Sequence, residues 1–141
     1  MPYGHRNIDN ILQEYRKSLA PPEEDWPFDV QLASRCLNKR LYDESLNVTE
    51  LKELCGIQSR NFSARFRYYT GEYPKDFLIR HRIAAAKRVL TSDTYNGSNL
   101  MELALSLGFR SHSSFTKAYR SREGVAPSKH ISSQVKSHTR T

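Results

Sequence analysis

The sequence has few cysteines, no long apolar run and no leader-like N-terminus. Cys36 and Cys55 are the two cysteines of the 141 residues, and they lie outside any CxxC or CxxC…HxxxH pattern typical of zinc sites. No apolar run approaches the roughly 20 residues that span a membrane. The stretch MPYGHRNIDN lacks the apolar core of a signal peptide. These absences disfavour zinc and membrane proteins and favour the cytoplasm.

Signatures of catalysis are also missing. The five histidines are scattered and form no motif with a nucleophile. No GxSxG, P-loop or GxGxxG sequence occurs. We therefore expect neither enzyme activity nor a bound cofactor.

Acidic residues are scarce in the second part of the chain. Residues 1–55 hold 7 Lys/Arg and 10 Asp/Glu, a balance of −3, whereas residues 56–141 hold 15 and 5, a balance of +10. Concentrated positive charge is typical of proteins that bind DNA, RNA or an anionic membrane. Charge alone leaves a solubilising surface as the alternative.

The first 28 residues form a separate segment. Pro21 and Pro22 end a predicted helix, and the acidic stretch PPEEDWP reads as a linker. This helix carries one apolar stripe, which packs on the main domain or meets a partner, and we favour packing. The stripe consists of Ile8, Ile11, Leu12, Tyr15 and Leu19. In the next helix, Asp29 is the expected cap, and Val30, Ala33, Leu37 and Leu41 line one side.

A longer pattern then occurs twice. NVTELKELCGI starts at Asn47 and NLMELALSLGF starts at Asn99, each with glutamate three residues after the asparagine and glycine nine after it. Asparagine followed by this glutamate resembles a capping box, so each segment is expected to open a short helix. Gly56 and Gly108 then end these helices, because glycine adopts positive φ readily.

A second helix follows each glycine, so each copy reads as a helix-turn-helix unit. Phe62 and Phe66 in the first copy, like Phe115 and Tyr119 in the second, are four residues apart and should face a core. The copies are offset by 52 positions before the turn and 53 after it, as 108 − 56 and 115 − 62 show. Matching pairs include Glu50/Glu102, Leu51/Leu103, Ser59/Ser111, Arg67/Arg120, Gly71/Gly124 and Pro74/Pro127.

The stretch between the copies predicts one linking helix. Ile79, Ile83, Ala86 and Leu90 recur at helical spacing, and TYNGS at 94–98 ends the helix. The predicted fold is all-α. An N-terminal extension (1–28) precedes a domain (29–132) with helix-turn-helix units at about 47–72 and 99–124 and a linker helix at about 74–92. A flexible polar tail (133–141) follows.

The outward faces of the two second helices are polar and carry no acid. At about 100° per residue, the side opposite the aromatic pair holds short polar residues and cations, which suit close approach to DNA phosphates and base edges. A direct repeat placed in successive major grooves would read an asymmetric site as a monomer, with its readers roughly 34 Å apart. These faces hold Arg60, Ala64 and Arg67 beside Ser63, and Ser113, Lys117 and Arg120 beside Thr116.

The motif LALSLGFRSHSSFTKAYRSREGVAPSKH resembles the C-terminal signature of AraC/XylS-type bacterial transcription regulators. The stretch FLIRHRIAAAKRVL resembles their linking helix, notably at Arg82, Ile83, Ala86, Val89 and Leu90. The likeness covers about residues 29–131. It implies seven helices, two helix-turn-helix subdomains, a rigid connecting helix, promoter recognition and contact with RNA polymerase, most often for activation.

The resemblance also implies which residues meet DNA. The first recognition helix would present Arg60, Ser63 and Ala64, and the second would present His112, Ser113 and Lys117. Phosphate or supporting contacts would come from Ser59, Arg67, Ser111, Thr116 and Arg120, and Asn61 completes the predicted set.

The first unit departs from the family pattern. Lys52 stands where a small alanine is usual, Gln58 where serine is frequent, and Ala64 where a basic residue is common. This leaves open whether the first unit reads bases or mainly grips the backbone. The short N-terminal extension has no room for a sensor barrel, which suggests a stand-alone regulator.

Two alternative functions follow from particular residues. Tyr68, Tyr69 and Tyr73 could stack on the bases of single-stranded RNA, although Tyr69 falls on the core side of its helix. The poorly matched first unit also fits a helical protein-interaction module, such as an anti-activator that keeps the fold but not the DNA affinity.

Overall fold

A computed structural model describes residues 2–95, 97 and 99–131, with side chains from Ile8 onward, and the predicted tail at 133–141 lies outside these residues. The described residues form α-helices and one 3₁₀-helix, η1, without any strand. This confirms the all-α prediction. The helices are α1 (Pro2–Lys17), α2 (Phe28–Lys39), α3 (Val48–Cys55), α4 (Phe62–Thr70), α5 (Pro74–Leu90), α6 (Leu100–Ser106), α7 (His112–Glu123) and η1 (Pro127–His130).

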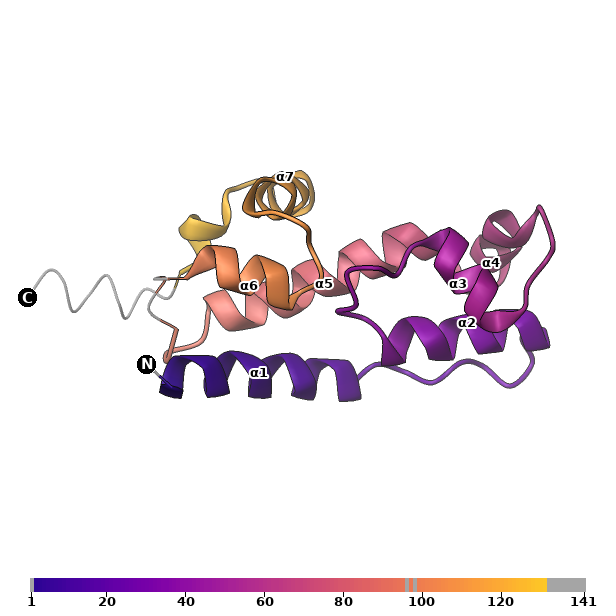
Figure 1. Ribbon diagram of the computed structural model, residues 1–141, viewed down its shortest axis with the longest axis horizontal. Coiled ribbons are helices and arrows are strands. Elements are labelled where there is room, and N and C mark those ends of the chain that lie inside the picture. The colour runs from indigo at the N-terminus through magenta and orange to yellow at the C-terminus, as the bar shows by residue number, and fades with distance from the viewer. Residues whose placement is uncertain (1, 96, 98, 132–141) are drawn as a thin grey trace, which may run out of the picture.

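The molecule is elongated and is organised along α5, which joins its two halves (Figure 1). Helices α2, α3 and α4 gather at one end of α5, and α6, α7 and η1 gather at the other. Helix α1 lies along the edge of the molecule opposite α7. The predicted pair of helix-turn-helix units joined by a linker helix is therefore confirmed. We call α3–α4 the first unit and α6–α7 the second unit.

The turns of the two units have the same hydrogen-bond pattern. The Gly56 N–H donates to Glu53 O at 3.2 Å and the Ile57 N–H to Lys52 O at 2.8 Å. The equivalent bonds in the second unit run from Gly108 N–H to Leu105 O at 3.1 Å and from Phe109 N–H to Ala104 O at 3.0 Å. This 6→1 and 5→2 pairing is the Schellman motif, and it needs a residue at positive φ. The glycines supply it, with φ of 66° and 94°.

Each unit buries its own aromatic pair. Phe62 and Phe66 are 1% exposed in one core, and Phe115 and Tyr119 are 0% exposed in the other. Helix α5 contributes Leu78 to the first core and Ile83 to the second, among other side chains. The periodicity of the two second helices thus predicts their buried sides correctly.

The N-terminal segment packs across both halves, and we call α1 with residues 18–27 the strap. Ile8 and Leu12 are buried in the core of the second unit, whereas Leu19 and Trp26 pack against that of the first. Tyr15 packs against both cores, and its hydroxyl lies 2.6 Å from Nδ1 of His81 on α5. The strap therefore covers the side of α5 that faces away from α7 (Figure 1).

Helix α2 starts two residues earlier than expected. Phe28 is its first residue, and Pro27 holds the N-cap position without a side-chain bond. The prediction that Asp29 caps this helix is therefore wrong. The Asp29 carboxylate accepts hydrogen bonds from the Val30 N–H and from the guanidinium of Arg65 on α4. A tertiary ion pair has thus replaced the local cap.

Phe115→Ala should lower the free energy of unfolding by about 3–5 kcal/mol, because it removes a fully buried ring. Tyr68→Ala is the matched control, since Tyr68 is 82% exposed and should change stability by less than about 0.5 kcal/mol. Urea unfolding followed by circular dichroism measures both. Equal stabilities for the two variants would contradict the placement of α7.

Gly108→Ala should destabilise the protein more than Gly56→Ala. Both changes place a Cβ at positive φ, at a cost of about 1–2 kcal/mol. A Cβ at position 108 would also lie 2.9 Å from the Tyr42 carbonyl oxygen, whereas one at position 56 meets nothing within 4 Å. Urea midpoints of the two variants test this order, and a less stable Gly56→Ala protein would reverse our interpretation.

His81 should make stability depend on pH. Burial lowers its pKa from 6.5 to about 4, and the nearby Arg80 acts in the same direction. In the unfolded chain His81 takes up a proton below about pH 6.5, whereas in the folded protein it stays neutral down to about pH 4. The free energy of unfolding is therefore at its full value, as far as His81 is concerned, above pH 6.5, and it decreases as the pH falls from 6.5 toward 4.

His81→Gln removes the titration and should flatten the loss of stability between pH 6.5 and 4 relative to the wild type. Unfolding free energies of both proteins, measured between pH 6.5 and 4, test whether His81 causes this loss of stability. Parallel pH profiles for the two proteins would show that His81 is not responsible.

Candidate nucleic-acid interface

The second helix of the second unit begins with a full N-terminal cap. The Ser111 hydroxyl oxygen accepts from the Ser114 N–H at 3.1 Å, and the Ser111 N–H donates to Ser114 Oγ at 3.3 Å. This reciprocal pair is a capping box built from two serines. Ser111 therefore starts α7 as well as lying at the candidate interface, a role that the S-x-x-S spacing could have indicated.

The predicted residues of α7 lie on its outer side. Ser113, Lys117 and Arg120 are exposed, and His112 is half-buried in the first turn. Neither Lys117 nor Arg120 forms an ion pair with a carboxylate among the described residues. Thr116 is different, because its hydroxyl oxygen is buried. The outer side of α7 thus offers free cations beside a short hydroxyl side chain.

The corresponding helix of the first unit begins later than its counterpart. Helix α4 starts at Phe62, so Ser59, Arg60 and Asn61 belong to the turn before it. The interpretation of Arg60 as a residue on the recognition helix, equivalent to Ser113, is therefore wrong. Ser59 matches Ser111 under the offset of 52, but the second helices follow the offset of 53, under which Gln58 stands opposite the Ser111 cap.

The lost cap explains the late start, because glutamine is not among the preferred N-cap residues. Ser59 Oγ accepts from the Asn61 N–H at 3.2 Å, two residues on, which closes a turn instead of a helix. Asn61 then holds the N-cap position of α4 without a side-chain bond. Arg60 and Asn61 remain exposed at the entrance of the helix.

The outer side of α4 combines an aromatic ring with one oriented cation. Ala64 is exposed, and Ser63 beside it is half-buried. Arg67 lies 4.9 Å from the centre of the Tyr73 ring and donates to the Tyr73 hydroxyl at 3.2 Å. Tyr68, which the predicted site omits, is 82% exposed, more than any other large apolar side chain among the described residues. The 100° rule places it within about 40° of Ala64, so periodicity could have found it.

An acid reduces the positive charge of the first unit. The Asp29 carboxylate pairs with the Arg65 guanidinium at 3.1 Å. This hydrogen bond lowers the pKa of Asp29. Arg65 corresponds to Ala118 in α7, whose outer cations have no such partner. The two units therefore differ in charge as well as in helix length.

The predicted residues form two separate sets, one at each end of α5. Ser59, Arg60, Asn61, Ser63, Ala64 and Arg67 belong to the first unit, and Ser111, His112, Ser113, Thr116, Lys117 and Arg120 to the second. In Figure 1, α7 lies above the left half of α5, and α4 lies at the right-hand end of α5. Two helix-turn-helix units in direct repeat, joined by one helix and with exposed cations on their second helices, are the architecture of a DNA-binding transcription regulator.

Comparison with known proteins gives the family. Residues 51–132, more than half of the chain, match the family described as "Helix-turn-helix domain". The chain belongs to this family of AraC/XylS-type transcription regulators, which bind double-stranded DNA. The family is one of regulators and not a class of enzymes.

Two curated relatives illustrate the similarity. The chain is 28% identical over 88 residues to the XylDLEGF operon transcriptional activator 2 of Pseudomonas putida, a match covering 62% of this chain and 56% of that protein. It is 28% identical over 87 residues to the probable transcriptional regulator LumQ of Photobacterium leiognathi, covering 62% of this chain and 34% of LumQ. The chain thus spans about half or less of the length of these relatives.

A solved structure shares the fold. The C-terminal domain of the two-component response regulator yesN from Fusobacterium nucleatum superposes with a TM-score of 0.62 at 22% identity, over 72% of this chain and 95% of that domain. In the described part of the present chain, no helix has the length and apolar character of a membrane span. Nor do three His, Cys, Asp or Glu side chains group there as metal ligands would.

Proposed function

We propose that this protein is a sequence-specific regulator, an activator in its main role, that binds an asymmetric promoter site as a monomer. Its α4 and α7 enter successive major grooves on one face of the DNA. The observation that carries the proposal is the direct repeat: both units have the same backbone turn, and α5 joins them with one unit at each end. Two-fold symmetry, which favours palindromic sites, is absent from such an arrangement.

The second unit supplies most of the base reading in this proposal. Lys117 and Ser113 lie on the exposed side of α7 and reach base edges, with His112 beside them in the first turn. Arg120 and the cap residue Ser111 contact phosphates. Thr116 supports the helix from within, because its hydroxyl is buried.

The first unit mainly grips the backbone. Arg60, Ser59 and Asn61 precede α4 and contact phosphates from the turn, and Arg67 does so from a position set by Tyr73. Ala64 has no hydrogen-bonding group and can contact only a thymine methyl, with the half-buried Ser63 beside it.

Activation implies a contact with RNA polymerase, and the printed name of the Pseudomonas putida relative is that of a transcriptional activator. We extend this role to the present chain, with residues 29–132 as the DNA-binding part and the cytoplasmic nucleoid as its location. Residues 133–141 stay a predicted tail.

One observation favours a second function, that of a protein-interaction module. Met101 and Leu105 lie one turn apart on α6 and are 60% and 51% exposed. Such a pair is a candidate contact for another protein. An anti-activator of this kind would bind DNA weakly and without sequence preference.

Selection of genomic fragments by the purified chain, followed by a salt titration on the best fragment, separates the two functions. Phosphate contacts make the affinity fall steeply with salt, by about 0.9 in log–log slope per phosphate neutralised. We expect one enriched asymmetric motif of roughly two helical turns, bound by one chain. Enrichment of a palindrome, or of nothing, would contradict the monomeric tandem reader.

Lys117→Ala should weaken specific binding by about 1–3 kcal/mol and change base preference at one position of the second half-site. Arg35→Ala is the control, because this exposed cation of α2 lines a hollow with Arg16 and Pro21 of the strap. Fluorescence anisotropy on the selected site measures both variants. Unchanged affinity in a folded Lys117→Ala protein would remove Lys117 from the interface.

A further inference from the structure

Arg82 is a charged side chain that is buried between the two units, with 7% of its surface exposed. Its Nε donates to the Leu41 carbonyl at 2.7 Å, and its Nη2 donates to the Asp43 carbonyl at 2.9 Å. Its Nη1 donates to the Gly108 carbonyl at 3.4 Å. Leu41 and Asp43 lie between α2 and α3, whereas Gly108 lies in the turn of the second unit. One guanidinium on α5 therefore contacts the backbone of both halves.

The chemistry of this contact requires arginine. A guanidinium presents five donors in a fixed plane, whereas lysine places its donors on one nitrogen. Burial lowers the pKa of Arg82, yet arginine stays protonated in proteins. A buried charge is costly unless hydrogen bonds satisfy it, and here backbone carbonyls of both halves do so. Any displacement of one half relative to the other would leave some of these donors unsatisfied.

The backbones of the two halves also touch beside Arg82. A Cβ at Gly108 would lie 2.9 Å from Tyr42 O and 3.0 Å from the Arg82 guanidinium carbon. The Tyr42 hydroxyl donates to Leu12 O of α1 at 2.7 Å. The turn of the second unit, the 41–43 segment and the strap are thus linked at one point. We call Arg82, residues 41–43 and Gly108 the Arg82 contact.

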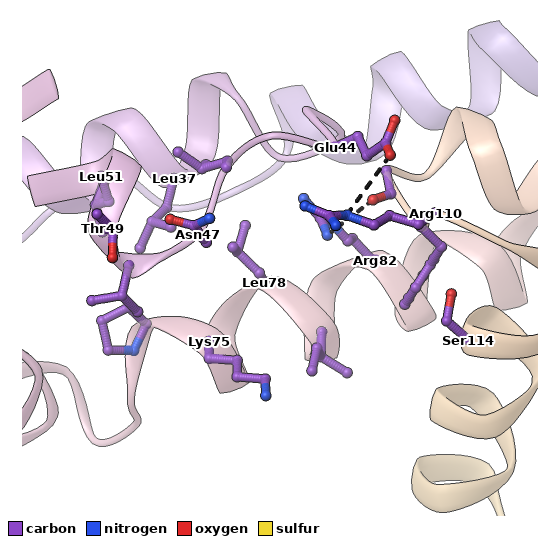
Figure 2. A pocket seen from close by; sticks show the side chains of 16 residues that line it. Leu37, Glu44, Asn47, Thr49, Leu51, Lys75, Leu78, Arg82, Arg110 and Ser114 are labelled. Carbon is purple, nitrogen blue, oxygen red and sulfur yellow. Dashed lines mark hydrogen bonds and ion pairs between the residues drawn. The ribbon is translucent and has the colours of Figure 1, made fainter. Parts of the chain in front are cut away.

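A hollow lies between the units beside this contact, and Arg82 and Gly108 form part of its lining. It has a volume of about 540 Å³ and is lined from both sides, with Leu51 of α3 and Ser114 of α7 at its walls. Figure 2 shows Arg82 beside Arg110, whose ion pair with Glu44 spans 3.9 Å. That pair is largely exposed, so it adds little to the connection. On this side of α5, the Arg82 contact resists relative motion of the units, because its three hydrogen bonds reach both halves.

We propose that Arg82 is a positioning residue that fixes the distance and rotation between the two DNA-reading units, so that the chain accepts one spacing between its half-sites. This inference rests on the tandem reading proposed above. One inserted base pair rotates the second half-site by about 34° around the DNA axis. A rigid reader cannot follow that rotation, whereas a reader whose units move relative to each other can.

The test measures affinities of the purified chain for the selected site and for duplexes with one or two base pairs added or removed between the half-sites. We expect the wild type to lose about tenfold in affinity per shifted base pair, comparable to one mismatched pair. Arg82→Lys and Arg82→Met should lose less than about threefold, while their affinity for the natural spacing also falls. The ratio between spacings is the informative quantity, because a general loss of folded protein lowers all affinities together.

Arg80→Lys is the matched control, since Arg80 lies two residues away on α5 and pairs with Glu72 at 2.6 Å, away from the second unit. It should keep the wild-type ratio. Folded Arg82 variants that also keep this ratio would overturn the proposal, as would a wild type that tolerates every spacing with both half-sites engaged. A different result would show that the two units do not both bind the site: deleting one half-site would then leave the affinity of the wild type unchanged.

A DNA-free measurement tests the same inference. Tyr68 and Ser121 are exposed and equivalent under the offset of 53, so cysteines can carry spin labels there after Cys36 and Cys55 are replaced by serine. We expect one narrow distance distribution in the wild type and a clearly broader one in Arg82→Lys, the more conservative variant. Equally narrow distributions would overturn the role of Arg82, whatever the DNA experiments give.

Discussion

Burial of α5 is the constraint on which the rest of the molecule depends. Three of the four helices of the two units are too short to be stable alone in water, with 8 residues in α3, 9 in α4 and 7 in α6. Each unit completes its core with side chains of α5, such as Leu78 at one end and Val89 at the other. The two readers exist as folded units because one 17-residue helix serves both.

The elements that could be predicted from the sequence are those marked by local hydrophobic periodicity and by glycines at turns. Both units, their turns and α5 follow from patterns within about 20 residues, and the structure has them within a few residues of the expected bounds. The late start of α4 was in principle visible too, because Gln58 stands where the second unit has its capping serine. The ion pair of Asp29 with Arg65 was not, since it joins residues 36 positions apart.

Arg82 shows the same limit more clearly. As a residue of the linking helix it stood out in the sequence, but its partners are 41, 39 and 26 positions away. Helical or strand periodicity cannot predict hydrogen bonds between a side chain and carbonyls so far away in the sequence. The role of Arg82 is therefore visible only in the three-dimensional structure. The candidate DNA-binding residues were easier to place, because the outer side of a helix follows from its buried side. Tyr68 was left out of the DNA-binding set because the sequence analysis considered it only as a stacking residue for single-stranded RNA.

The shared turn has a consequence for how such a chain diverges. The geometry of the turn depends on two backbone hydrogen bonds and one glycine, so the side chains next to it contribute little to that geometry. The two units share this backbone although Lys52 in one stands at the position of Ala104 in the other, and although the exposed residues of their second helices differ. Substitutions on the exposed side of either second helix can therefore change what that unit recognises without changing the fold. Two units with the same backbone and different binding surfaces are the expected result.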